Sequence, residues 1–207
     1  MVFSSHVFLF YFLPIVLLGY YACPVRWRQS LIALVSYVFY GWWDWRFLSL
    51  LATSTVVDYF CARRIRESGS KSARKRYLLI SLLVNLGILG VFKYFNFFID
   101  TLNDVVPAGM EIHDLAYVTL PLGISFYTFQ SISYTIDVYR GEATAIRNPV
   151  DYWCYVSMFP QLVAGPIVRF KDVADQLRER THTIEKFARG LAFLGLGLCK
   201  KILLANP

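Results

Sequence analysis

The stretch Leu120-Pro-Leu-Gly-Ile-Ser-Phe-Tyr-Thr-Phe-Gln-Ser-Ile-Ser-Tyr-Thr-Ile-Asp-Val-Tyr-Arg140 is long and apolar enough to enter a bilayer, yet polar groups occur along its whole length. On a helix that advances about 100° per residue, these polar groups form two stripes. One stripe holds Gln130, Ser133 and Asp137, and the other holds Ser125, Thr128, Ser131 and Thr135. Polar groups are unfavourable against lipid, so we expect neither stripe to face it.

The composition is typical of a membrane protein. A hydrophobic content of 57% in 207 residues and a mean hydropathy of +0.46 exceed what a soluble domain of this size usually carries. The net charge of +7 could indicate nucleic-acid binding, but seven of the 21 basic residues lie between Arg63 and Arg76, next to apolar segments. Such a cluster favours an orientation signal, and we expect no nucleic-acid partner.

Apolar segments recur along the whole chain at close to the length that crosses a bilayer, about 17 to 25 residues. They predict an all-α, polytopic transmembrane protein forming one membrane domain over residues 1–207. The predicted spans lie near residues 7–23, 29–43, 46–62, 77–99 and 117–136.

The distribution of charge predicts the orientation of these spans. By the positive-inside rule, the predicted loop 63–76 lies in the cytoplasm, and its placement fixes every other side. Met1 is then outside, as is the predicted loop 100–116, which contains acidic residues but no Lys or Arg. We therefore expect a multi-pass membrane protein with its N-terminus outside.

The segment after the fifth span predicts a break in this pattern. Residues 152–166 are apolar but too short for a full span, and Pro160 interrupts them. Basic residues follow, so a re-entrant or broken helix that returns to the cytoplasmic side fits the charge bias. We then expect an amphipathic surface helix over 170–180 and a membrane segment over 187–206.

None of the three histidines is placed for catalysis in this topology. Histidine is the usual general base near neutral pH, but His6 and His113 are predicted at the outer face and His182 at the cytoplasmic surface, so none lies inside the membrane. Glu111, His113 and Asp114 share one loop, which is too small a ligand set to indicate a metal site. We therefore expect no metal and no catalytic residue in this chain.

Several segments together carry a family resemblance. They are the stretch quoted above, Ser36-Tyr-Val-Phe-Tyr-Gly-Trp-Trp43, Phe92-Lys-Tyr-Phe-Asn96, Phe159-Pro-Gln-Leu-Val-Ala-Gly-Pro-Ile-Val-Arg169 and Arg180-Thr-His-Thr-Ile-Glu-Lys-Phe187. The chain resembles the N-terminal part of membrane-bound O-acyltransferases, in the branch that acetylates alginate. The family's later half, with a Trp-His motif that supplies the histidine regarded as catalytic, has no counterpart here.

The resemblance implies a function. It implies acetyl transfer from a cytoplasmic donor, through a pore, to an exported polysaccharide such as alginate, with the donor as co-substrate and no bound cofactor. Membrane lipid and a periplasmic acetyltransferase or polysaccharide-secretion proteins are the implied partners. Without the histidine half we expect the chain to be inactive alone, and without the missing helices we expect the two polar stripes to be exposed to lipid.

The candidate site is the cytoplasmic entrance of this pore. Asp137 and Arg140 lie three residues apart on a helix, so an interfacial ion pair is the alternative to a functional role. A transporter or permease fragment and a noncatalytic scaffold of a polysaccharide-secretion complex are the alternative functions. The residues expected to line the entrance are Ser125, Gln130, Ser133, Asp137, Arg140, Gln161 and Arg169.

Overall fold

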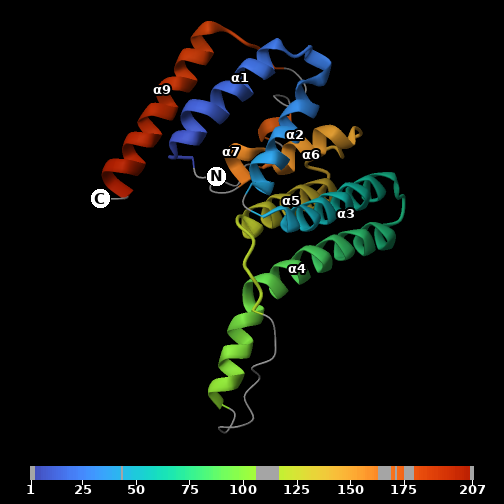
Figure 1. Cartoon of the computed structure of the whole chain (residues 1–207). Helices are drawn as coiled ribbons and strands as arrows, with labels where there is room; N and C mark the ends of the chain where they lie inside the picture. The colour runs from blue at the N-terminus through green and yellow to red at the C-terminus, as the bar shows by residue number, and fades with distance from the viewer. Residues whose placement is uncertain are drawn as a thin grey trace.

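Helices account for the regular structure throughout the part of the chain that the computed structural model describes, residues 3–42, 44–105, 117–162, 169–170, 172–174 and 180–205. No strand occurs among these residues, which confirms the all-α class (Figure 1). The helices are α1 (Leu13–Ala22), α2 (Arg28–Gly41), α3 (Leu48–Glu67), α4 (Lys71–Val105), α5 (Ile124–Arg140), α6 (Pro149–Ser157), α7 (Phe159–Leu162) and α9 (Ile184–Lys200). A wider helical turn, Val7–Phe12, leads into α1, and another, Lys201–Ala205, continues α9.

One of the described helices, α4, is long and apolar enough to cross a bilayer by length and composition. Residues 7–22 form a shorter apolar helix. The five predicted spans coincide in position with α1 to α5, although the helix ends differ from those expected. That α1 to α5 cross a membrane remains a prediction.

The basic cluster lies on helices, which corrects the expected loop over residues 63–76. Helix α3 continues to Glu67 and α4 begins at Lys71, so the connection is only Ser68 to Ser70. Arg and Lys are good helix formers, and positive side chains are favourable near the C-terminal end of α3.

Helix α5 has well-defined ends. It begins at Ile124, later than the expected span, because Pro121 and the left-handed Gly123 (φ 76°) precede it. It stops at Gly141, also left-handed (φ 81°), where the Asp137 carbonyl accepts hydrogen bonds from the amides of Glu142 and Ala143 at 2.9 and 3.2 Å. Upstream, the side chain of Asn96 exchanges two hydrogen bonds with the backbone of Val118, at 2.8 and 3.0 Å, and so ties the approach to α5 onto α4.

The core lies where α3, α4 and α5 pack together, with α6 covering α5 and α2 packed on α6 (Figure 1). Its centre is rich in tyrosine, and Tyr127, Tyr134, Tyr152 and Tyr155 are completely buried. A second cluster, Phe8, Phe39 and Phe159, joins the N-terminal segment to α2 and α7. Helices α1 and α9 lie beside each other away from the bundle, and α9 has no buried residue.

The segment expected to be re-entrant forms two short helices. Helix α6 has nine residues and α7 has four, both far below the roughly 20 that span a bilayer. Met158 separates them with a non-helical ψ of 111°. Residues 163–168, most of the expected surface helix 170–180, and residues 106–116 of the expected outer loop lie outside the described residues, so those predictions stand as they were.

Candidate functional site

Both polar stripes of α5 are largely covered by other helices. Gln130 and Asp137 are 2% and 4% exposed, and Ser131 and Thr135 are completely buried. Ser125 and Ser133 are only half-buried, so most of each stripe, but not all of it, is packed against protein. That the stripes avoid lipid stays a prediction. The expectation that the stripes need further helices to cover them was wrong, because α3, α4 and α6 of the same chain pack on α5.

One stripe meets the backbone of α6. The last carbonyls of any helix lack an intrahelical partner, and the break at Met158 leaves the Tyr155 carbonyl in that position. Two side-chain amides donate to this oxygen: Gln130 from α5 at 2.8 Å and Gln161 from α7 at 2.9 Å. Two of the predicted site residues, far apart in the sequence, thus converge on one atom.

Asp137 lies two helical turns beyond Gln130 on the same stripe. Its Oδ2 is buried and accepts no hydrogen bond from any described residue. Arg140 is exposed, and no ion pair joins it to Asp137, which rejects the interfacial pair considered from the sequence. The Oδ2 atom of Asp137 is therefore a buried acceptor without a hydrogen-bond donor among the described residues.

The other predicted site residues do not join this junction. The Ser133 hydroxyl donates to the Gln130 carbonyl of its own helix at 2.8 Å. Ser125 is half-buried and Arg169 is exposed. Of the seven predicted residues, the structure brings together Gln130 and Gln161, with Asp137 on the same face.

The sequence analysis missed a second buried acid, Asp58 on α3. Its carboxyl group is completely buried and accepts from the Ser81 hydroxyl at 2.5 Å and from the Asn85 amide at 2.8 and 2.9 Å. Ser54 donates to the Asn85 carbonyl oxygen at 2.6 Å, and Ser81 reaches the Thr135 hydroxyl of α5 at 3.3 Å. A signal was available, because an acidic residue inside a predicted span is unusual and calls for a partner.

A third cluster, also missed, ties α1 and α2 to the segment before α9. Tyr20 lies 3.2 Å from Nε2 of His182 and accepts from Arg180 at 3.3 Å. Gln29 accepts from Arg180 at 3.2 Å and from the Cys154 thiol at 3.0 Å. These contacts join residues more than a hundred positions apart, so no local pattern could have predicted them.

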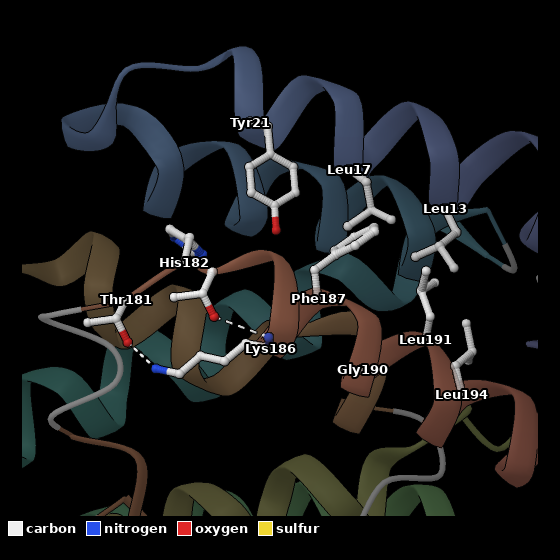
Figure 2. Close-up of a pocket in the computed structure, with 11 residues that line it drawn as sticks. Leu13, Leu17, Tyr21, Thr181, His182, Lys186, Phe187, Gly190, Leu191 and Leu194 are labelled. Atoms are coloured by element: carbon white, nitrogen blue, oxygen red, sulfur yellow. Dashed lines mark hydrogen bonds between the residues drawn. The ribbon is translucent and has the colours of Figure 1, made fainter.

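A groove of about 330 Å³ runs between α1 and α9 beside this cluster (Figure 2). Leucines from both helices and Phe187 line most of it. At one end Figure 2 shows His182 and Lys186, whose ammonium group donates to the Thr181 hydroxyl. The groove is therefore apolar along its length and cationic at its mouth.

The structure offers no metal-ligand cluster among the residues it describes. Glu111, His113 and Asp114, considered from the sequence, lie outside that part of the chain. His6 and His182 are both exposed, so neither of these two described histidines is enclosed near the α5–α6 junction.

Comparison with known proteins identifies relatives of the whole chain. Residues 140–206 match the membrane-bound O-acyltransferase family. The chain is 48% identical over its full length to the probable alginate O-acetylases AlgI of Pseudomonas aeruginosa and Azotobacter vinelandii, covering 40% and 42% of those proteins. It is also 31% identical to the peptidoglycan O-acetyltransferase of Helicobacter pylori, covering 45% of it.

The chain thus spans about two fifths of the length of the curated relatives it matches. No solved structure matches it. The family match begins at the end of α5 and runs through α6, α7 and α9, and the similarity to the alginate O-acetylases covers every other element as well. The chain is thus similar over its whole length to probable alginate O-acetylases, and residues 140–206 match the membrane-bound O-acyltransferase family.

Proposed function

We propose that the protein takes part in membrane O-acetyl transfer to an exported polysaccharide such as alginate. The observation that carries the proposal is the 48% identity to probable alginate O-acetylases over the entire chain. The lower identity of 31% to the peptidoglycan O-acetyltransferase favours alginate over peptidoglycan as the acceptor. The acetyl donor enters as a cytoplasmic co-substrate, and no resident cofactor is part of the proposal.

The α5–α6 junction supports a role in placing the substrate. Ser125, Gln130, Ser133, Asp137, Arg140, Gln161 and Arg169 are the residues proposed to line the cytoplasmic entrance. Gln130 and Gln161 fix the end of α6 through the Tyr155 carbonyl, and the unused oxygen of Asp137 is available to a donor group on a ligand. We assign these residues to positioning the substrate rather than to proton transfer. Holding reactants in place can lower a barrier by several kcal/mol, about 7 to 11 in the best cases, so positioning alone can have a large effect.

The proposed setting is the bacterial inner membrane, with several spans, an outside N-terminus and α6–α7 entering the bilayer without crossing it. The basic ends of α3 and α4 and the broken helix pair support this arrangement. A periplasmic acetyltransferase or polysaccharide-secretion proteins would then receive the acetyl group or the modified polymer.

Because the chain alone is expected to be inactive, acetyl transfer can be tested in proteoliposomes that hold it together with the later half of an alginate O-acetylase, with an activated acetyl donor on one side of the membrane and alginate on the other. Asp137→Asn and Gln130→Leu should each lower the transfer rate by about tenfold. Thr53→Val is the matched control, since this exposed hydroxyl bonds only its own helix, to the Ser49 carbonyl, and transfer should be unchanged. Transport of a solute by proteoliposomes without acetyl transfer would instead support the permease alternative.

The orientation has its own test. A single cysteine introduced as Ser70→Cys, in a cysteine-free background, should resist an impermeant thiol reagent added outside intact cells. Labelling of that position from outside would reverse the proposed topology.

A further inference from the structure

A basic hollow lies where the end of α3 meets the segment that follows α5. Its volume is about 390 Å³. The residues that line it are Arg63, Arg66, Glu67, Ala145, Ile146 and Arg147.

The wall of the hollow is held by one hydrogen bond at each of three successive residues. Arg66 donates to the Ala145 carbonyl at 3.1 Å, and the Ile146 amide donates to the buried Tyr134 hydroxyl at 2.9 Å. The Tyr59 hydroxyl donates to the Arg147 carbonyl at 2.6 Å. Ala145 and Ile146 are themselves buried, at 2% and 6% exposed. The hollow is thus organised before any ligand arrives, which reduces the entropy lost on binding.

Positive charge exceeds negative charge in this hollow. Its single carboxylate, Glu67, forms an ion pair with Arg63 at 2.8 Å, and the hydrogen bond from Arg63 lowers the pKa of Glu67 below its ordinary value of 4.5. Glu67 is therefore ionised at neutral pH and offsets one of the three guanidinium groups. No carboxylate within the described ranges pairs with Arg66 or Arg147.

We propose that this hollow binds an anion that carries a phosphate group, with Arg66 and Arg147 as its main ligands. Planar guanidinium groups match phosphate oxygens in a two-pronged geometry. The positive-inside rule alone accounts for basic residues at a helix end, but it does not require a segment fixed at three consecutive residues. A phospholipid headgroup and a soluble phosphate ester present the same chemistry, and the inference is independent of acetyl transfer.

The test is a binding titration of the purified chain in uncharged detergent. The probes are inorganic phosphate and, separately, mixed micelles containing phosphatidylglycerol or phosphatidylcholine. Arg147→Gln should weaken binding about tenfold, because a charge-assisted hydrogen bond is lost. Only the backbone of Arg147 is held by Tyr59, so this variant should keep its fold, as a circular dichroism melt would verify.

Two further variants distinguish specific binding in the hollow from general attraction of an anion to nearby positive charge. Arg64→Gln removes a neighbouring exposed charge that does not line the hollow, and it should change affinity by less than about twofold. Arg147→Lys keeps the charge but loses the two-pronged guanidinium geometry, and it should weaken binding nearly as much as Arg147→Gln.

The outcomes are distinct. Binding of phosphatidylglycerol without binding of inorganic phosphate supports the site and assigns it to a headgroup. Binding of inorganic phosphate supports it and assigns it to a soluble ester. Equal losses from Arg64→Gln and Arg147→Gln, or no binding of either probe, would overturn the proposal.

Discussion

Two buried carboxyl groups in this chain have opposite surroundings. Asp58, between α3, α4 and α5, accepts hydrogen bonds at both oxygens. Asp137, at the junction of α5 with α6, has a buried oxygen with no donor among the described residues. Fully satisfied networks fix a single packing arrangement, whereas an unused buried acceptor needs an explanation such as a ligand. The comparison assigns the first junction to stability and agrees with the proposal that the second one lines a substrate path.

The largest expected effect is the loss of stability in Asp58→Ala. The change leaves the Ser81 hydroxyl and the Asn85 amide without their shared acceptor, so the free energy of unfolding should fall by about 2 to 4 kcal/mol. Denaturant titration in detergent measures this loss. Asp58→Asn, which keeps one carbonyl oxygen, is the control and should lose less. Equal stability of Asp58→Ala and the parent would show that the network is not structural.

Asp137→Asn should have the reverse profile. Its unused oxygen contributes nothing to holding α5 on α6, so stability should stay within about 0.5 kcal/mol. Acetyl transfer should nevertheless fall about tenfold, because a ligand-directed acceptor is lost. Parallel unfolding and turnover measurements decide the matter. A variant that is destabilised but fully active would remove Asp137 from the proposed site.

The shared acceptor at Tyr155 predicts coupling between two glutamines. Gln130→Leu alone leaves Gln161 to satisfy the carbonyl, and Gln161→Ala alone leaves Gln130. The double variant removes both amide donors, so its loss of stability should exceed the sum of the single losses by about 1 kcal/mol. A double-mutant cycle measures this excess. Additive losses would mean that the two amides do not act on one oxygen.

An exposed carboxylate gives the smallest expected effect. Hydrogen bonding to Arg63 lowers the pKa of Glu67, so its contribution to stability is present above about pH 4.5 and is lost as the pH falls through the folded-state value below that. Both side chains are about half exposed, at 55% and 49%, which limits the effect. The difference in Tm between the parent and Glu67→Gln should be small at pH 7 and should shrink as the pH falls below 4.5. A difference that does not change with pH would assign the effect to packing.

The sequence predicted where the first five helices lie along the chain, but it did not predict which helices pack against each other. Hydrophobic length located α1 to α5, and helical periodicity identified the face of α5 on which Gln130 and Asp137 are buried. The start of α4 was misplaced because helix-forming Arg and Lys extend it into the expected loop, to Lys71. The partners of α5 could not be predicted, because periodicity defines which residues share a face but not which helix covers it.

The site shows the same limit. Gln130, Asp137 and Gln161 could be proposed because polar residues stand out in apolar segments. Their shared contact at Tyr155 could not, since it depends on where α6 ends. Asp58 was overlooked although it lies in a predicted span, and the Tyr20–His182 contact joins residues 162 positions apart.

Glycines with a left-handed backbone precede and follow α5, and they fix the number of residues in this helix. Between Gly123 and Gly141 there are 17 helical residues, and both glycines have a left-handed backbone that other residues adopt only at a penalty of about 1 to 2 kcal/mol. A single inserted residue after Gln130 would swing everything downstream by about 100° around the helix axis. Asp137 would then leave α6 while Gln130 remained in place. Insertions and deletions should therefore be tolerated in the connecting segments but excluded from α5, whose residue count sets the direction of its acid.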